Sequence, residues 1–78
     1  MDPAKAFGQV LRDLRASAGL SQARLAEESN LDRTFISLME RGLRQPSLET
    51  MIVLSHALGI TLSKMVQRVE SELTSRHR

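Results

Sequence analysis

Apolar residues recur along the chain at helical spacing and are interrupted by residues that cap or end helices. Between residues 4 and 18 they follow the pattern i, i+3, i+4, i+7 and i+11, which predicts an amphipathic helix. This stripe consists of Phe7, Val10, Leu11, Leu14 and Ala18. Pro3 fits the first turn of this helix, and Gly19 is suited to ending it. Gly8 lies in its interior at a cost of about 1 kcal/mol relative to Ala, so we expect another backbone to pack closely there.

Four shorter helices are predicted after the first, over residues 22–29, 33 to about 41, 48–58 and 62 to about 73. Each is preceded by a polar residue able to cap a helix, namely Ser21, Asp32, Ser47 and Thr61. Residues that favour left-handed backbone follow three of the helices, namely Asn30, Gly42 and Gly59. The alternation typical of strands is absent. The pattern predicts an all-α, compact five-helix domain over residues 1–73 and a polar, frayed tail over residues 74–78.

The composition restricts the class of protein. A chain of 78 residues forms one domain, and at this size only roughly 60% of the unfolded surface is buried. We therefore expect a marginally stable monomer that gains support from good helix packing or a second subunit. Cysteine is absent, which excludes disulfides and thiolate metal sites. There is no membrane-spanning apolar run and no signal-peptide pattern, so a cytoplasmic location is expected.

Charge alone does not establish a partner. Eleven Lys and Arg face nine acidic residues, giving a net charge of +2, and only Lys5 and Lys64 are lysines. Arginine suits bidentate contacts with phosphate and guanine. A solvated, arginine-rich surface without any ligand is an equally good interpretation of the same composition.

The most informative feature is the pair of short helices at residues 22–29 and 33–41. Only Asn30, Leu31 and Asp32 separate them, and a turn of this length with a left-handed residue orients the second helix at roughly 90–120° to the first. Inward-facing apolar residues are expected to hold that angle, namely Leu25, Ala26, Leu31, Ile36 and Met39. The pattern favours a helix-turn-helix in which the second helix protrudes.

The outer face of the protruding helix carries side chains suited to DNA. Arginine can bond guanine, and small hydroxyls can contact base edges or the thymine methyl group. We therefore predict base contacts by Arg33, Thr34 and Ser37. Phosphate contacts are predicted for Gln22, Arg41, Arg44 and Gln45. Solvated surface positions are the alternative interpretation of each of these residues.

A long segment, LSQARLAEESNLDRTFISLMERGLRQPSLETMIVLSHALGI, resembles the lambda-repressor-like, XRE-type helix-turn-helix regulators. The resemblance covers residues 7–65 and is strongest to the short controller proteins of restriction–modification systems. It implies a five-helix domain that binds a two-fold operator as a homodimer. It also implies a structural ion pair between Arg15 and Glu40.

Three positions depart from the family pattern. Asn30 replaces the commoner glycine, which left-handed geometry tolerates. Phe35 stands where many controller proteins have tyrosine, so a hydroxyl contact to phosphate is expected to be lost. Leu38 stands where some phage repressors place a polar side chain, which predicts fewer base contacts toward the end of the helix.

The last predicted helix carries more apolar residues than one small domain needs. We predict a dimer interface there, formed by Ile60, Leu62, Met65, Val66 and Val69. Ordinary core packing followed by a frayed end is the alternative. The expected partners are a double-stranded DNA operator, a second copy of the chain and RNA polymerase, with no membrane.

Other function classes receive less support. A phage-type repressor remains a close alternative, and an antitoxin-like protein-interaction module is a further one, although little chain extends beyond Leu73 to hold a partner. No nucleophile or phosphate-loop motif is present, so no enzymatic activity is predicted. His56 and His77 have no companions at metal-ligand spacing, so neither a metal nor a cofactor is predicted.

Overall fold

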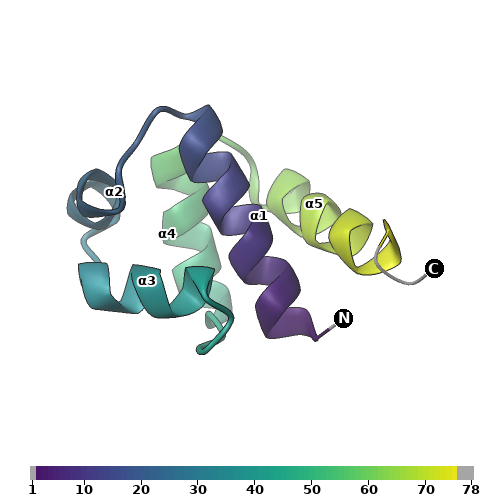
Figure 1. Cartoon of the computed structure of the whole chain (residues 1–78). Helices are drawn as coiled ribbons and strands as arrows, with labels where there is room; N and C mark the ends of the chain where they lie inside the picture. The colour runs from purple at the N-terminus through teal and green to yellow at the C-terminus, as the bar shows by residue number, and fades with distance from the viewer. Residues whose placement is uncertain (1, 76–78) are drawn as a thin grey trace.

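The computed structural model describes residues 2–75, which form five α-helices without a strand in that range (Figure 1). The helices are α1 (Pro3–Ser17), α2 (Gln22–Ser29), α3 (Arg33–Glu40), α4 (Leu48–Leu58) and α5 (Leu62–Ser75). The predicted all-α, five-helix architecture is therefore confirmed. None of these helices combines the length and apolar character needed to cross a bilayer.

The helix starts follow the predicted caps. The side-chain oxygens of Ser21, Asp32, Ser47 and Thr61 accept hydrogen bonds from backbone N–H groups in the first turns of α2, α3, α4 and α5 at 2.8–3.1 Å. The end of α5 differs most from the prediction, whereas α1 and α3 each end one residue earlier than predicted. Thr74 and Ser75 complete α5 instead of beginning a frayed tail, and the Thr74 hydroxyl donates to the carbonyl oxygen of Glu70 at 2.9 Å. The rest of the predicted tail, residues 76–78, lies outside the described residues.

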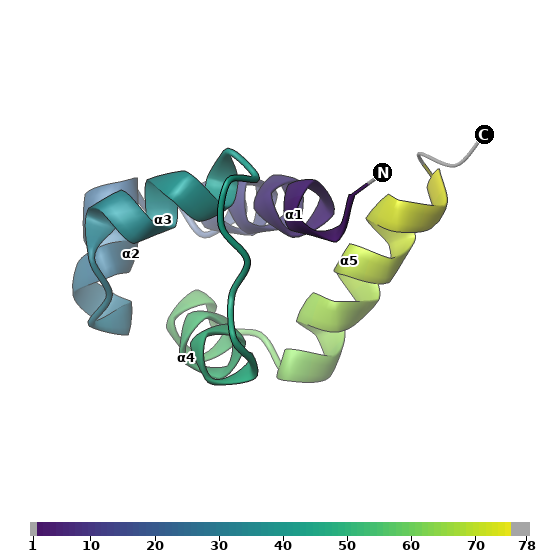
Figure 2. The same cartoon turned by 90° about the horizontal axis from the view of Figure 1, so that it is seen from below.

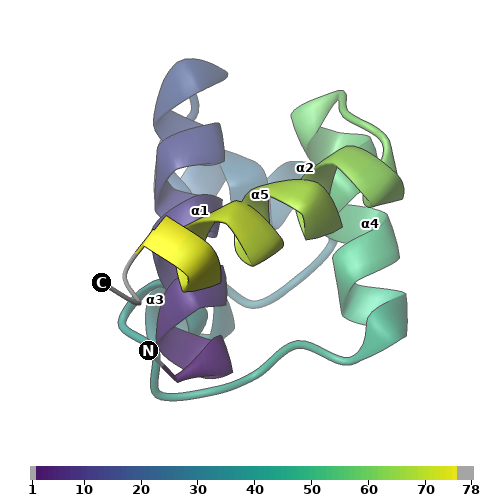
Figure 3. The same ribbon diagram turned by 90° about the vertical axis from the view of Figure 1, so that its right-hand side faces the viewer.

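α1 is the central element, with α3 and α5 both packed against it. α2 packs on α3 and α4, while α5 crosses both α1 and α4 (Figure 3). In Figure 1, α3 lies at the lower left of the molecule, and no other helix is drawn directly beneath it. Figure 2 looks onto this edge and shows the segment after α3 passing across the molecule to the start of α4. Among the described residues, nothing packs over one side of α3, and Arg33 and Thr34 at its start are exposed.

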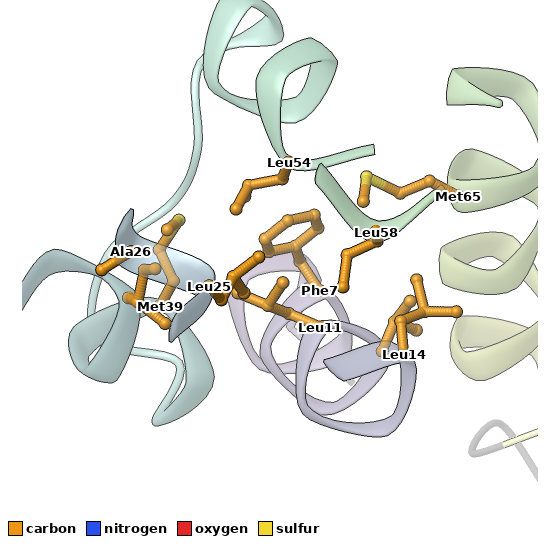
Figure 4. Packing of buried hydrophobic residues seen from close by; sticks show 11 residues of the cluster. Phe7, Leu11, Leu14, Leu25, Ala26, Met39, Leu54, Leu58 and Met65 are labelled. Carbon is orange, nitrogen blue, oxygen red and sulfur yellow. The ribbon is translucent and has the colours of Figure 1, made fainter. Parts of the chain in front are cut away.

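The core draws on all five helices (Figure 4). The ring of Phe7 lies in the middle of the cluster, close to side chains of α1 and α4. Met65 enters from α5 and is completely buried, which corrects its assignment to a dimer interface. A side chain without exposed surface in one subunit has none to offer a second subunit.

Gly8 lies where α1 packs tightly against the end of α3. A Cβ atom at this position would lie 2.3 Å from the carbonyl oxygen of Met39 and 2.8 Å from that of Glu40. Both distances are far below van der Waals contact, so no larger residue fits without moving a helix. The close backbone packing predicted at Gly8 is confirmed, and it sets the separation between α1 and the end of α3.

Candidate nucleic-acid interface

The turn between α2 and α3 has the expected left-handed geometry. Asn30 ends α2 with φ 58° and ψ 37°. The N–H of Leu31 then bonds the carbonyl oxygen of Ala26 at 3.0 Å, as in a Schellman C-cap. The apolar residues predicted to hold the helices together are buried or half-buried, namely Leu25, Ala26, Leu31, Ile36 and Met39. The turn and its core therefore fix α3 relative to α2.

The side chains predicted to contact bases gather at one place on the open side of α3. Arg33 and Thr34 are exposed, and Ser37 is half-buried. Together with Gln22, at the start of α2, they line a shallow open pocket of about 220 Å³. The pocket thus presents a guanidinium, two hydroxyls and an amide to the solvent.

The ion pair expected from the family resemblance is linked to this pocket through Gln22, which bonds Glu40. The Arg15 Nε donates to Oε2 of Glu40 at 2.6 Å, and its Nη2 donates to Oε1 at 3.0 Å. The third Arg15 nitrogen, Nη1, donates to the backbone oxygen of Leu20 at 2.9 Å. The Glu40 side chain has no exposed surface, whereas 18% of the Arg15 side chain remains exposed. This pair ties α1 to the C-terminal end of α3.

Glu40 has further partners that sequence reasoning missed. The Gln22 Nε2 donates to Oε1 of Glu40 at 2.9 Å, and the Arg12 Nε lies 3.9 Å from the same oxygen. Burial by itself would raise the pKa of Glu40. The hydrogen bonds from Arg15 and Gln22, with the charges of Arg15 and Arg12, outweigh burial and hold that pKa below its ordinary value. Glu40 is therefore a carboxylate at neutral pH.

The other predicted phosphate-contacting residues follow the end of α3. Arg41 caps the helix, and Arg41, Arg44 and Gln45 are all exposed. The Arg44 guanidinium lies over the ring of Phe35 at 5.8 Å from its centroid, a cation–π arrangement that was not predicted. Phe35 itself is half-buried and packs against the core cluster. The Phe35 ring thus contacts the Arg44 guanidinium, although Phe35 lacks the hydroxyl group of tyrosine.

Four of the predicted dimer residues retain some surface. Val66 is 44% exposed, and Ile60, Leu62 and Val69 are half-buried. Val66 and Val69 line a mostly apolar pocket of about 170 Å³ between α5, the start of α1, the segment before α4 and α4 itself. Its other lining residues are Pro3, Phe7, Gln45, Pro46 and Met51.

Metal-ligating side chains do not cluster within residues 2–75: no group of three or more His, Cys, Asp or Glu is placed to hold an ion. His56 is exposed on α4. His77 lies outside the part of the chain that the structure describes.

The sequence of the chain matches the helix-turn-helix family over residues 11–65. It belongs to that family of transcription regulators. Within it, the chain is similar to restriction–modification controller proteins. It is 42% identical over 67 residues to control protein C.MunI of Mycoplasma sp, an alignment that covers 85% of this chain and 90% of the relative.

Solved structures agree with this relationship. The controller protein C.AhdI from Aeromonas hydrophila has a TM-score of 0.77 at 44% identity, covering 80% of this chain and 94% of its own. The controller protein C.Esp1396I, solved as a tetramer in complex with its natural 35 base-pair operator, has a TM-score of 0.86 at 26% identity. That alignment covers 95% of this chain and 97% of the relative.

Proposed function

We propose that this chain is a sequence-specific, controller-type transcription regulator that binds a two-fold DNA operator as a homodimer. The observation that carries the proposal is the open edge of α3, where Arg33, Thr34 and Ser37 share a pocket with Gln22. An α-helix fits the major groove, which is about 12 Å wide, so this edge can meet the base pairs. The similar controller protein C.Esp1396I was solved in complex with its operator, which supports DNA binding by this chain.

Arg33 is the principal base-reading residue in this proposal. It occupies the first position of α3, is exposed, and its guanidinium can form a bidentate contact with guanine O6 and N7. Thr34 and Ser37 supply shorter hydroxyl groups, which can bond a base edge or contact a thymine methyl group. Arg33 should therefore contribute most of the discrimination at one base pair.

Phosphate contacts come from both sides of α3. Gln22 at the start of α2 retains one amide N–H beyond its bond to Glu40. Arg41, Arg44 and Gln45 follow the C-terminal end of α3 and are exposed. Such contacts fix the position of a helix in the groove without reading sequence.

Homodimerisation is proposed through α5 and the segment before it. Apolar surface is offered there by Ile60, Leu62, Val66 and Val69. Met65 is excluded from the proposed interface because it is buried. A two-fold dimer would use the same patch on both copies. The two copies of α3 would then lie about 34–36 Å apart, one turn of duplex.

Selection of bound sites from random duplexes tests the proposal. We expect a palindromic site with half-site centres about 10 base pairs apart. The selected duplex then serves for titrations of the Arg33→Ala variant against single-base operator variants. Binding should weaken by about 1–3 kcal/mol on the parent operator and become indifferent to one base position.

Arg44→Ala is the matched comparison, because it should weaken binding to all the operator variants alike. Failure to enrich any sequence would contradict the proposal, as would equal losses on every operator variant for Arg33→Ala. Transcription in vitro from a promoter that carries the selected site, with RNA polymerase added, then distinguishes repression from assistance to the polymerase.

A further inference from the structure

The side chain of Gln22 is held by a group that belongs to the α1–α3 tie. Its Nε2 donates to Oε1 of Glu40 at 2.9 Å, and the two oxygens of that carboxylate also accept bonds from Arg15 at 2.6 and 3.0 Å. The Glu40 side chain has no exposed surface. Gln22 is thus the point where the buried ion pair reaches the open pocket of α3.

The chemistry of Glu40 determines which end of the Gln22 amide faces it. An ionised carboxylate only accepts hydrogen bonds, so Gln22 must present its NH₂ group and turn its carbonyl oxygen away. A DNA phosphate is also acceptor-only and would repel a carbonyl oxygen. The NH₂ group has a second N–H, which remains available for a phosphate oxygen.

We propose that Glu40 is a positioning residue for DNA binding, which orients the Gln22 amide so that its second N–H faces a backbone phosphate. This inference rests on the proposed function. The bond to Glu40 exists before DNA arrives, so less side-chain freedom is lost on binding. Arg15 and Arg12 offset the carboxylate charge, which would otherwise act against the phosphates.

A double-mutant cycle on the selected operator tests the coupling. Glu40→Gln keeps the shape of the side chain but presents both a donor and an acceptor, so the Gln22 amide is free to flip. We expect Glu40→Gln and Gln22→Ala each to weaken binding roughly 5-fold, the equivalent of one hydrogen bond. Glu40→Gln should cause no further loss in the Gln22→Ala background. Equal losses in both backgrounds would overturn the proposal.

The control for the charge change is Glu28→Gln, which removes an exposed carboxylate from α2 that pairs with Arg24 at 3.0 Å. It should leave operator binding unchanged. Unfolding curves on every variant define conditions in which all are fully folded. A purely structural role of Glu40 would weaken binding independently of the residue at position 22.

A second measurement does not depend on any variant folding or on DNA. In the free wild-type protein, NMR relaxation of the Gln22 side-chain amide should give an order parameter near that of rigid backbone, about 0.85. A value below about 0.6, typical of a flexible group, would overturn the positioning role. Failure of the wild-type protein to bind any selected duplex would instead contradict the proposed function.

Discussion

The half of the molecule formed by α1, α2 and α3 differs from the α4–α5 half in how completely its side chains are packed and hydrogen-bonded within the chain. In the first half, the buried Glu40 carboxylate is matched by Arg15 and Gln22, and Gly8 lets α1 and α3 meet backbone to backbone. In the second half, α5 buries only Met65. Large apolar side chains remain exposed on α4 and α5, namely Leu48, Ile52 and Val66.

The first half is thus closely packed within a single chain, whereas the second half leaves apolar side chains exposed to solvent. A helix that must meet DNA in one orientation benefits from a rigid base, and a buried, fully bonded ion pair makes α3 rigid relative to α1. A surface that retains apolar side chains around a pocket can instead lose water when a second copy covers it. The two halves therefore fit the two proposed contacts, the first with DNA and the second with another subunit.

Glu40→Ala should have the largest effect, because it leaves the Arg15 charge without its partner. We expect a loss of about 3 kcal/mol in the free energy of unfolding, at the lower end for a broken buried pair because water reaches Arg15. Operator binding should fall with it. Urea unfolding followed by circular dichroism measures the loss.

The matched control is Glu28→Ala, which breaks the exposed pair with Arg24 on α2. Its effect on unfolding should be much smaller, since solvent screens an exposed pair. Equal stabilities for Glu40→Ala and the wild-type protein would show that the ion pair does not hold α1 to α3.

Gly8→Ala tests the backbone contact between the same helices. The new methyl group would lie within 3 Å of the carbonyl oxygens of Met39 and Glu40, so the helices must separate. We expect destabilisation of about 2 kcal/mol, which is typical of overpacking. Thermal unfolding of the variant measures it.

Ala16→Gly, at an exposed position of the same helix, provides the comparison. There alanine should be the more stable residue, by up to about 1 kcal/mol, as helix propensity predicts. The preference for glycine at position 8 is therefore expected to be the reverse of the usual one. A stabilised Gly8→Ala protein would contradict the close approach.

Val66→Ser tests the exposed apolar surface of α5. Removing part of an exposed apolar side chain should leave the monomer stable but weaken dimerisation by about 1 kcal/mol per subunit, or roughly 30-fold in the dissociation constant for two copies. Sedimentation equilibrium at several protein concentrations measures the change. Gln67→Ser, at the next residue of α5, should leave the association constant unchanged. A wild-type protein that stays monomeric would remove α5 as an interface.

Whether a feature could be predicted depends on how far apart in the sequence its interacting residues lie. The caps Ser21 and Asp32 bond backbone groups within three residues, so the sequence reveals the helix starts directly. Glu40 and Gln22 are 18 residues apart, and their bond depends on side-chain conformations that no local pattern specifies. Met65 shows another limit. An apolar stripe predicts that a helix face is covered but does not say whether the same chain or a second copy covers it.

Lowering the pH should reduce the free energy of unfolding through protonation of Glu40. This is the smallest of the expected effects and the most specific. The pKa of Glu40 in the folded protein lies below its ordinary value of 4.5, because the hydrogen bonds and charges around it outweigh its burial. The ionised form therefore stabilises the fold, fully so above the unfolded-state pKa. This contribution is lost as the pH falls through the lower, folded-state pKa.

Other carboxylates titrate in the same range, so the informative quantity is the difference in unfolding free energy between the wild-type protein and Glu40→Gln. That difference should be constant above about pH 5 and should shrink at lower pH, as urea unfolding at a series of pH values would show. A difference independent of pH would mean that the charge of Glu40 contributes nothing to the tie between α1 and α3.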